Sequence, residues 1–212
     1  MPVRTIPKNY RNVTGIAAHS KADGQAMFES TLERDFISLL EFDKHVSRFE
    51  VQPVKITWLN KEDKRRSYTP DVVAFRQGEK PTLYEVKYRS DLKVNWDKLQ
   101  PKFRMAIKYA KENQWRFKIV TEKEIRTPYL ESVKFLLPFI RQGASEEADM
   151  ALLVGNLKKL GRATPTGLLE KIYSDPWNQA RLLPTLWYLI GTGQIGMNLN
   201  QKITMTREIW SC

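Results

Sequence analysis

Residues 68–88 read YTPDVVAFRQGEKPTLYEVKY and contain two short runs with the composition of β-strands. Residues 71–75 and residues 82–88 are both rich in β-branched and aromatic side chains. Between them, Gly78 and Pro81 are typical of a turn. We therefore expect a β-hairpin that brings the two runs side by side.

Three charged residues of this hairpin are expected to meet. Side chains alternate between the two faces of a strand, so Glu85 and Lys87 share one face of the second run. Asp71 opens the first run and would lie on the neighbouring strand. An exposed ion pair between Glu85 and Lys87 is the simpler interpretation. Two acids and one base on adjacent strands instead favour a site for a divalent ion, because carboxylate oxygens are the ligands that Mg²⁺ prefers.

The surrounding sequence alternates between helix and strand patterns, which indicates an α/β core with a mixed central sheet flanked by helices. Helical spacing of apolar residues predicts helices over residues 28–46 and 97–113. Strand composition predicts one strand over residues 49–59 and another over 117–120. We expect residues 60–66 to form a charged turn, and Thr121 with Glu124 to form a capping box.

Glu33 is a candidate third acid. At about 100° per residue, it lies on the same side of the first helix as Phe36, Ile37 and Leu40. The alternative is that it lies at the edge of the apolar stripe and reaches water. Glu29 is a weaker candidate for a site residue, because the helix can expose its side chain to water without cost.

A second domain is expected after a segment of small and acidic residues at 142–148. We place the boundary so that residues 1–145 form an N-terminal arm of about 25 residues with the α/β domain, and residues 146–212 form the second domain. Helical patterns at 152–160, 166–173 and 179–190 precede a predicted hairpin of residues 193–199 and 202–206. Three helices followed by a hairpin suggest a winged-helix-like domain.

The charge balance favours a polyanionic partner. With 35 Lys and Arg against 24 Asp and Glu, the net charge is +11 and the pI about 9.7. Many basic residues follow Lys87, and we expect Lys93, Lys98, Lys102 and Arg104 to contact DNA phosphates. A solvated basic helix face is the alternative for each residue taken singly.

Other classes of protein are disfavoured by the composition. The single cysteine, Cys212, can form neither an internal disulfide nor a cysteine-rich zinc site. We expect neither a signal peptide nor a membrane anchor, because no sufficiently apolar segment is present. These features predict a cytoplasmic protein that does not interact with membranes.

The segments FESTLERDF, SYTPDVVAF and YEVKY occur in the order of the motifs of the PD-(D/E)xK restriction-endonuclease-like superfamily. Within it, the chain resembles TnsA, the endonuclease subunit of bacterial heteromeric cut-and-paste transposases. The resemblance covers roughly residues 28–124. It extends to the C-terminal part, because TnsA proteins carry a winged-helix-like domain after the nuclease.

This resemblance implies a Mg²⁺-dependent endonuclease that cleaves donor DNA at transposon ends, with Mn²⁺ able to replace Mg²⁺. Glu33, Asp71 and Glu85 would hold metal and water, and Lys87 would stabilise charge on the water and the phosphate. Family members also carry Gln at the position of Glu85, so this acid is the least essential. The implied reaction is hydrolysis by a metal-activated water without a covalent intermediate.

The implied partners are double-stranded DNA, a TnsB-like recombinase subunit and a TnsC-like AAA+ ATPase regulator. A restriction or repair nuclease of the same fold is the main alternative, and a non-catalytic DNA-binding adaptor is the next. We expect DNA affinity to reside in the nuclease half. The apolar, weakly charged C-terminal half would dock a protein partner.

Overall fold

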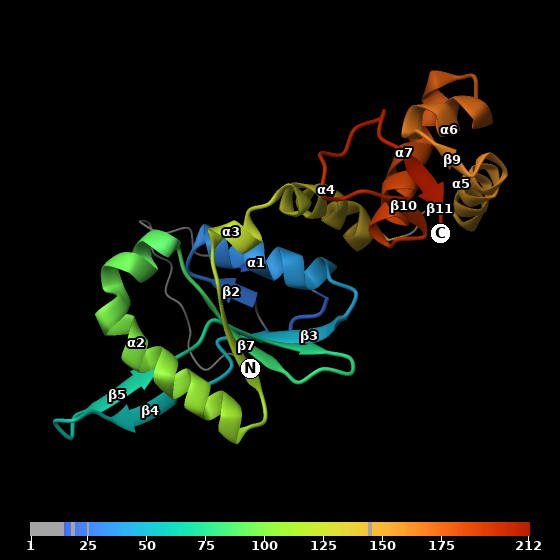
Figure 1. The fold of residues 1–212 in the computed structure, drawn as a ribbon. Coiled ribbons are helices and arrows are strands. Elements are labelled where there is room, and N and C mark those ends of the chain that lie inside the picture. Colours follow the sequence, from blue (N-terminus) through green and yellow to red (C-terminus); the bar gives the residue numbers. More distant parts are fainter. Residues whose placement is uncertain (1–14, 18–19, 25, 144–145) are drawn as a thin grey trace. The chain divides into compact units, whose positions relative to one another are not determined.

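The computed structural model describes residues 15–17, 20–24, 26–143 and 146–212 of the chain. They divide into two compact units, Met1–Arg126 and Thr127–Cys212. The elements of both are labelled in Figure 1. None of the described helices combines the length and the apolar character needed to cross a membrane.

The first unit is built on a four-stranded mixed sheet with the strand order β3-β6-β7-β8. The β3–β6 and β6–β7 pairs are antiparallel, whereas β7 and β8 are parallel. The predicted hairpin is present as β6 and β7, and the mixed α/β class is confirmed. The strands are β3 (Val46–Val51), β6 (Val72–Arg76), β7 (Thr82–Val86) and β8 (Arg116–Val120).

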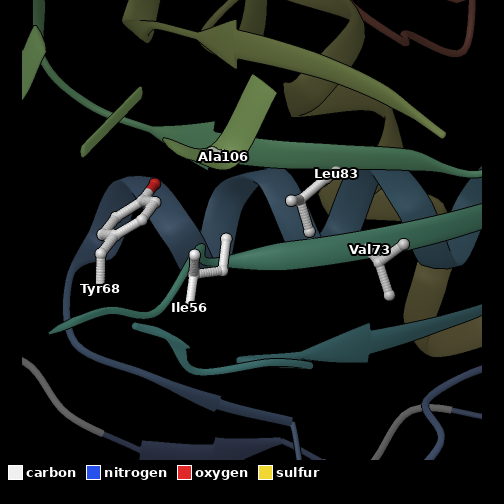
Figure 2. Packing of buried hydrophobic residues seen from close by; sticks show 5 residues of the cluster. All are labelled: Ile56, Tyr68, Val73, Leu83 and Ala106. Carbon is white, nitrogen blue, oxygen red and sulfur yellow. The ribbon is translucent and has the colours of Figure 1, made fainter. Parts of the chain in front are cut away.

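Helices α1 (Thr31–Phe42) and α2 (Arg89–Glu112) pack against opposite faces of this sheet (Figure 1). On the α1 face, the rings of Phe36 and Tyr84 lie 5.0 Å apart. On the α2 face, Ala106 packs in one cluster with Val73 and Leu83, as Figure 2 shows. The alternation of side chains along β7 thus places Leu83 and Glu85 on the side of α2.

A separate hairpin completes the α2 face. Strands β4 (Ile56–Leu59) and β5 (Arg65–Tyr68) pair antiparallel, and Ile56 and Tyr68 join the same cluster (Figure 2). The single strand predicted over residues 49–59 is wrong, because residues 52–55 separate β3 from β4. The predicted turn of residues 60–66 is wrong for the first half of β5, whose Arg65 and Arg66 are charged and exposed.

Several element bounds differ from the predicted ones. Helix α1 begins at Thr31, because Ser30 caps it and Phe28 lies in strand β2 (Ala26–Phe28). Strand β1 (Gly15–Ala17) pairs with β2, so part of the expected unstructured arm is a strand, while residues 1–14 lie outside the described residues.

Helix α2 begins earlier than predicted and is interrupted at Asn95, whose φ of −109° and ψ of 17° are not helical. The predicted capping box of Thr121 and Glu124 is present in helix α3 (Glu122–Ile125).

The second unit contains four helices and a three-stranded antiparallel sheet with the order β10-β11-β9 among its described residues. The three helices predicted after the linker are present as α5, α6 and α7. The second strand of the predicted hairpin is wrong: residues 202–206 form a loop, and Ile209–Ser211 form the strand instead. The elements are α4 (Pro128–Gln142), α5 (Glu147–Leu160), β9 (Arg162–Ala163), α6 (Pro165–Ile172), α7 (Pro176–Gly191), β10 (Ile195–Met197) and β11 (Ile209–Ser211).

The boundary between the units lies before α4, whereas the sequence suggested a boundary after residue 145. Helix α4 packs on α7, where the rings of Phe135 and Trp187 lie 5.1 Å apart. The absent side chain of Gly191 gives room to Ile140, since a Cβ there would lie 2.9 Å from two of its atoms. These contacts explain why α4 belongs to the second unit although an acidic segment follows it.

Candidate active site

Asp71, Glu85 and Lys87 meet where β6 begins and β7 ends. The amide of Asp71 donates to the carbonyl of Tyr84, and Val72 pairs with Tyr84 in the register of the two strands. Lys87 follows β7 and places its Nζ 3.1 Å from Glu85 Oε1 and 3.5 Å from Asp71 Oδ2. The structure therefore brings together the three hairpin residues that the sequence predicted to converge.

Both acids are held by further hydrogen bonds. Asp71 Oδ2 accepts a hydrogen bond of 2.7 Å from the amide of Val86. The side chain of Glu85 is only 2% exposed, and its Oε2 accepts a short hydrogen bond from the hydroxyl of Tyr68. Glu85 thus has a neutral donor on one oxygen and the Lys87 ammonium on the other. Such contacts fix the directions in which the two carboxylates point.

The charges of the site favour the binding of a cation. Burial, followed by the charge of Asp71, raises the pKa of Glu85 to about 8, against the opposing effect of Lys87. Burial likewise raises the pKa of Asp71, although Lys87 opposes this shift. The pKa of Lys87 is raised despite burial, because two carboxylates stabilise its charged form. One ammonium group does not fully compensate two buried acids.

Glu33 is buried as predicted, at 9% exposure, but its carboxylate is used at the start of α1. Its Oε2 accepts from the amide of Glu29 at 2.8 Å, and its Oε1 accepts from the hydroxyl of Ser30 at 2.9 Å. Burial and the nearby charge of Asp71 raise the pKa of Glu33 to about 7. Glu33 therefore lies close to Asp71 while its carboxylate is hydrogen-bonded to the two residues that precede α1.

A cavity of about 440 Å³ opens beside these groups. Asp71, Glu85 and Lys87 lie in its wall, and Glu33 does not. Of the four predicted DNA contacts, Lys102 lines the cavity, whereas Lys93, Lys98 and Arg104 are exposed on α2 outside it. The cavity wall also contains residues that the sequence did not predict at the site: Glu29, Gln52, Lys55 and Tyr68.

These additional residues carried little signal in the sequence. Tyr68 follows a charged segment with the composition of a turn, and Gln52 and Lys55 lie in a segment whose composition predicts one continuous strand. Glu29 precedes α1, and the helical pattern of the sequence predicts an exposed side chain there. Only the packing of β4 and β5 beside β7 brings Tyr68 to Glu85.

The donor set of the cavity wall fits a hard divalent cation. Mg²⁺ usually binds through one or two carboxylates while it keeps several waters and contacts substrate phosphates. Asp71 and Glu85 supply two carboxylates of this kind. Among the residues that the structure describes, no three His, Cys, Asp or Glu side chains form a group ready to hold a metal ion. The cavity wall therefore suits a cation that is bound by only a few protein ligands.

One comparison with known proteins bears on this segment. Residues 43–122 match a family model described as "TnsA-like endonuclease N terminal". The matched residues include Asp71, Glu85 and Lys87, and Glu33 precedes them. No curated protein sequence matches the chain.

Proposed function

Because the chain is TnsA-like over residues 43–122, we propose that it is the endonuclease subunit of a transposase and hydrolyses phosphodiester bonds of donor DNA. The observation that carries the proposal is the position of Lys87, whose ammonium group lies between Asp71 and Glu85 at the wall of a cavity. A purely structural ion pair would need neither a second acid nor a cavity.

Each residue of this group has a distinct task in the proposed reaction. Asp71 and Glu85 would hold Mg²⁺, with Glu33 beside them. When bound, Mg²⁺ lowers the pKa of water and polarises the phosphate. Lys87 keeps its proton, because both acids raise its pKa, and it stabilises negative charge on the attacked phosphate. Tyr68 and the amide of Val86 hold the carboxylates in place.

The test of this proposal is cleavage of DNA carrying transposon ends by the full-length chain in Mg²⁺. Asp71→Asn and Lys87→Ala should each reduce cleavage by about a thousandfold while leaving the far-UV circular dichroism spectrum unchanged. Asp63→Asn, in the exposed turn between β4 and β5, is the matched control and should cleave like wild type. Wild-type cleavage by either site variant would disprove the assignment and favour a non-catalytic DNA-binding adaptor.

Removal of the metal gives an independent test. Excess chelator should stop cleavage without preventing assembly with partner proteins, and Mn²⁺ should restore cleavage. Full activity in chelator would contradict a role for a divalent cation.

We further propose that cleavage depends on a recombinase subunit and an AAA+ ATPase regulator. The support is the TnsA-like segment together with a second, weakly charged unit. Three helices with a small antiparallel sheet suit a winged-helix module that docks protein partners. A restriction or repair nuclease would cut purified DNA alone. Unaided, efficient cleavage would therefore replace the transposase setting but preserve the nuclease assignment.

A further inference from the structure

Glu29 and Gln52 form a polar pair in the wall of the cavity that also contains Asp71 and Glu85. Gln52 Nε2 donates to Glu29 Oε1 at 3.3 Å. Glu29 lies before α1 and Gln52 lies directly after β3, so the pair joins two segments that border the cavity. The charge of Glu29 also contributes to the raised pKa of Asp71, which places Glu29 close to the proposed active site.

The backbone of Gln52 is held in an unfavourable conformation. Its φ is 50°, in the left-handed region that non-glycine residues rarely adopt, and Pro53 follows it. The amide of Gln52 donates to the carbonyl of Asp71 at 2.8 Å, which ties this strained residue to the start of β6. Strain of this kind is concentrated at binding and catalytic sites.

The side chain of Gln52 has an unsatisfied acceptor. Gln52 is 7% exposed, and its buried Oε1 has no hydrogen-bond partner within the described part of the chain. A buried acceptor without a donor destabilises the fold, because its hydrogen bonds to water are lost and not replaced. A ligand that brings a donor to this position would remove that cost.

Glu29, rather than Glu33, is the acid from the α1 side that faces the cavity. Both carboxylate oxygens of Glu33 accept hydrogen bonds at the helix start, and Glu33 does not line the cavity. Glu29 and Gln52 together present a carboxylate and an amide oxygen, which are both acceptors. Such a pair suits a positively charged ligand that is rich in donors, and a hydrated divalent cation has both properties.

We propose that Glu29 and Gln52 bind the water shell of the divalent cation that Asp71 and Glu85 hold. This inference rests on the proposed nuclease function and adds two binding residues to it. Mg²⁺ retains several waters when it binds to proteins, and each of these waters donates hydrogen bonds. The orphaned Gln52 acceptor would then be satisfied in the loaded site, and the Glu29 carboxylate would accept hydrogen bonds from the same waters.

The experiment is a titration of the full-length, metal-free chain with MgCl₂ by isothermal calorimetry. Glu29→Gln and Gln52→Met should each weaken Mg²⁺ binding by about tenfold. Glu62→Gln and Gln77→Met, which alter exposed turn residues by the same substitutions, should bind like wild type. The melting temperature of each metal-free variant is measured in parallel, because a merely structural role would change it and leave the Mg²⁺ affinity unchanged.

A third variant keeps the proposal testable if Gln52→Met does not fold. Gln52→Glu adds a carboxylate at the same position and should tighten Mg²⁺ binding. If wild type binds Mg²⁺ and the Glu29 and Gln52 variants bind it equally well, the inference is wrong and the proposed function stands. If wild type itself binds no Mg²⁺, the metal-dependent nuclease proposal fails instead.

Discussion

The ammonium group of Lys87 is shared by two acids with different partners. Asp71 also receives a backbone amide, whereas Glu85 also receives the Tyr68 hydroxyl. The backbone amide is fixed by the pairing of β6 and β7. The hydroxyl instead depends on β5, which belongs to another hairpin. Glu85 is therefore the acid whose position is most sensitive to a single substitution outside the main sheet.

Tyr68→Phe should reduce cleavage by about tenfold and lower the free energy of unfolding by about 1–2 kcal/mol. The substitution keeps the ring in the core but leaves Glu85 Oε2 buried without its donor. Cleavage kinetics and urea denaturation measure the two effects. Tyr109→Phe is the control, because this half-buried tyrosine packs against the same hydrophobic cluster. Equal behaviour of the two variants would show that Tyr68 acts only through its ring.

At the scale of elements, the β4–β5 hairpin connects core packing with the active site. Ile56 and Tyr68 are register partners across the hairpin, and both lie in the cluster with Val73, Leu83 and Ala106 (Figure 2). The opposite end of the hairpin, near Leu59, is exposed. Its stability therefore comes from one end, where a buried pair anchors it against α2 and β7.

Ile56→Ala should destabilise the chain by about 2–4 kcal/mol, because it opens a cavity in this cluster. Leu59→Ala lies on the same strand, but Leu59 is 63% exposed, so its effect should stay within about 0.5 kcal/mol. Urea denaturation of both variants measures the difference. Similar values for both would mean that the hairpin does not contribute to the core as the packing indicates.

At the scale of the whole molecule, charge and packing divide the chain in the same place. The unit Thr127–Cys212 has nine Lys and Arg against seven Asp and Glu, an excess of two. Nine of the eleven net positive charges therefore belong to Met1–Arg126. This unequal distribution favours DNA binding by the first unit and protein binding by the second.

Simultaneous replacement of Lys93, Lys98, Lys102 and Arg104 by Ala should weaken DNA binding at least tenfold. It should also flatten the salt dependence of binding, since fewer counterions are released. Fluorescence anisotropy at several salt concentrations measures both effects. Lys158 and Lys159, exposed on α5, provide the control when both are replaced by Ala. A larger loss in the control would make the second unit the DNA reader.

The unit boundary makes a further prediction about fragments. Residues 127–212 should unfold cooperatively on heating, whereas residues 146–212 should melt at a lower temperature or remain unfolded. The shorter fragment lacks α4, whose Phe135 and Ile140 cover Trp187 and Gly191 of α7. Differential scanning calorimetry compares the two fragments. Equal melting temperatures of the two fragments would instead support a domain boundary after residue 145.

The sequence alone determined the features that depend on local pattern. Strand alternation and a short turn predicted the β6–β7 hairpin and the convergence of Asp71, Glu85 and Lys87. Helical spacing predicted α1, the longer part of α2 and three helices of the second unit. The capping box of Thr121 and Glu124 was also predictable. All of these signals lie within a few residues of one another, so no knowledge of the tertiary structure is needed to interpret them.

Only the tertiary structure decided which distant segments share the site. The sequence did not predict β5, because its charged residues do not have the composition of a strand and its stability comes from pairing with β4. Tyr68 reaches Glu85, and Gln52 reaches Glu29, through packing between elements that are separate in the sequence. Helix α4 joins the second unit for the same reason, since its apolar face is covered by α7. Contacts between segments far apart in the chain leave little local pattern, and they decided the wall of the cavity and the division of the chain.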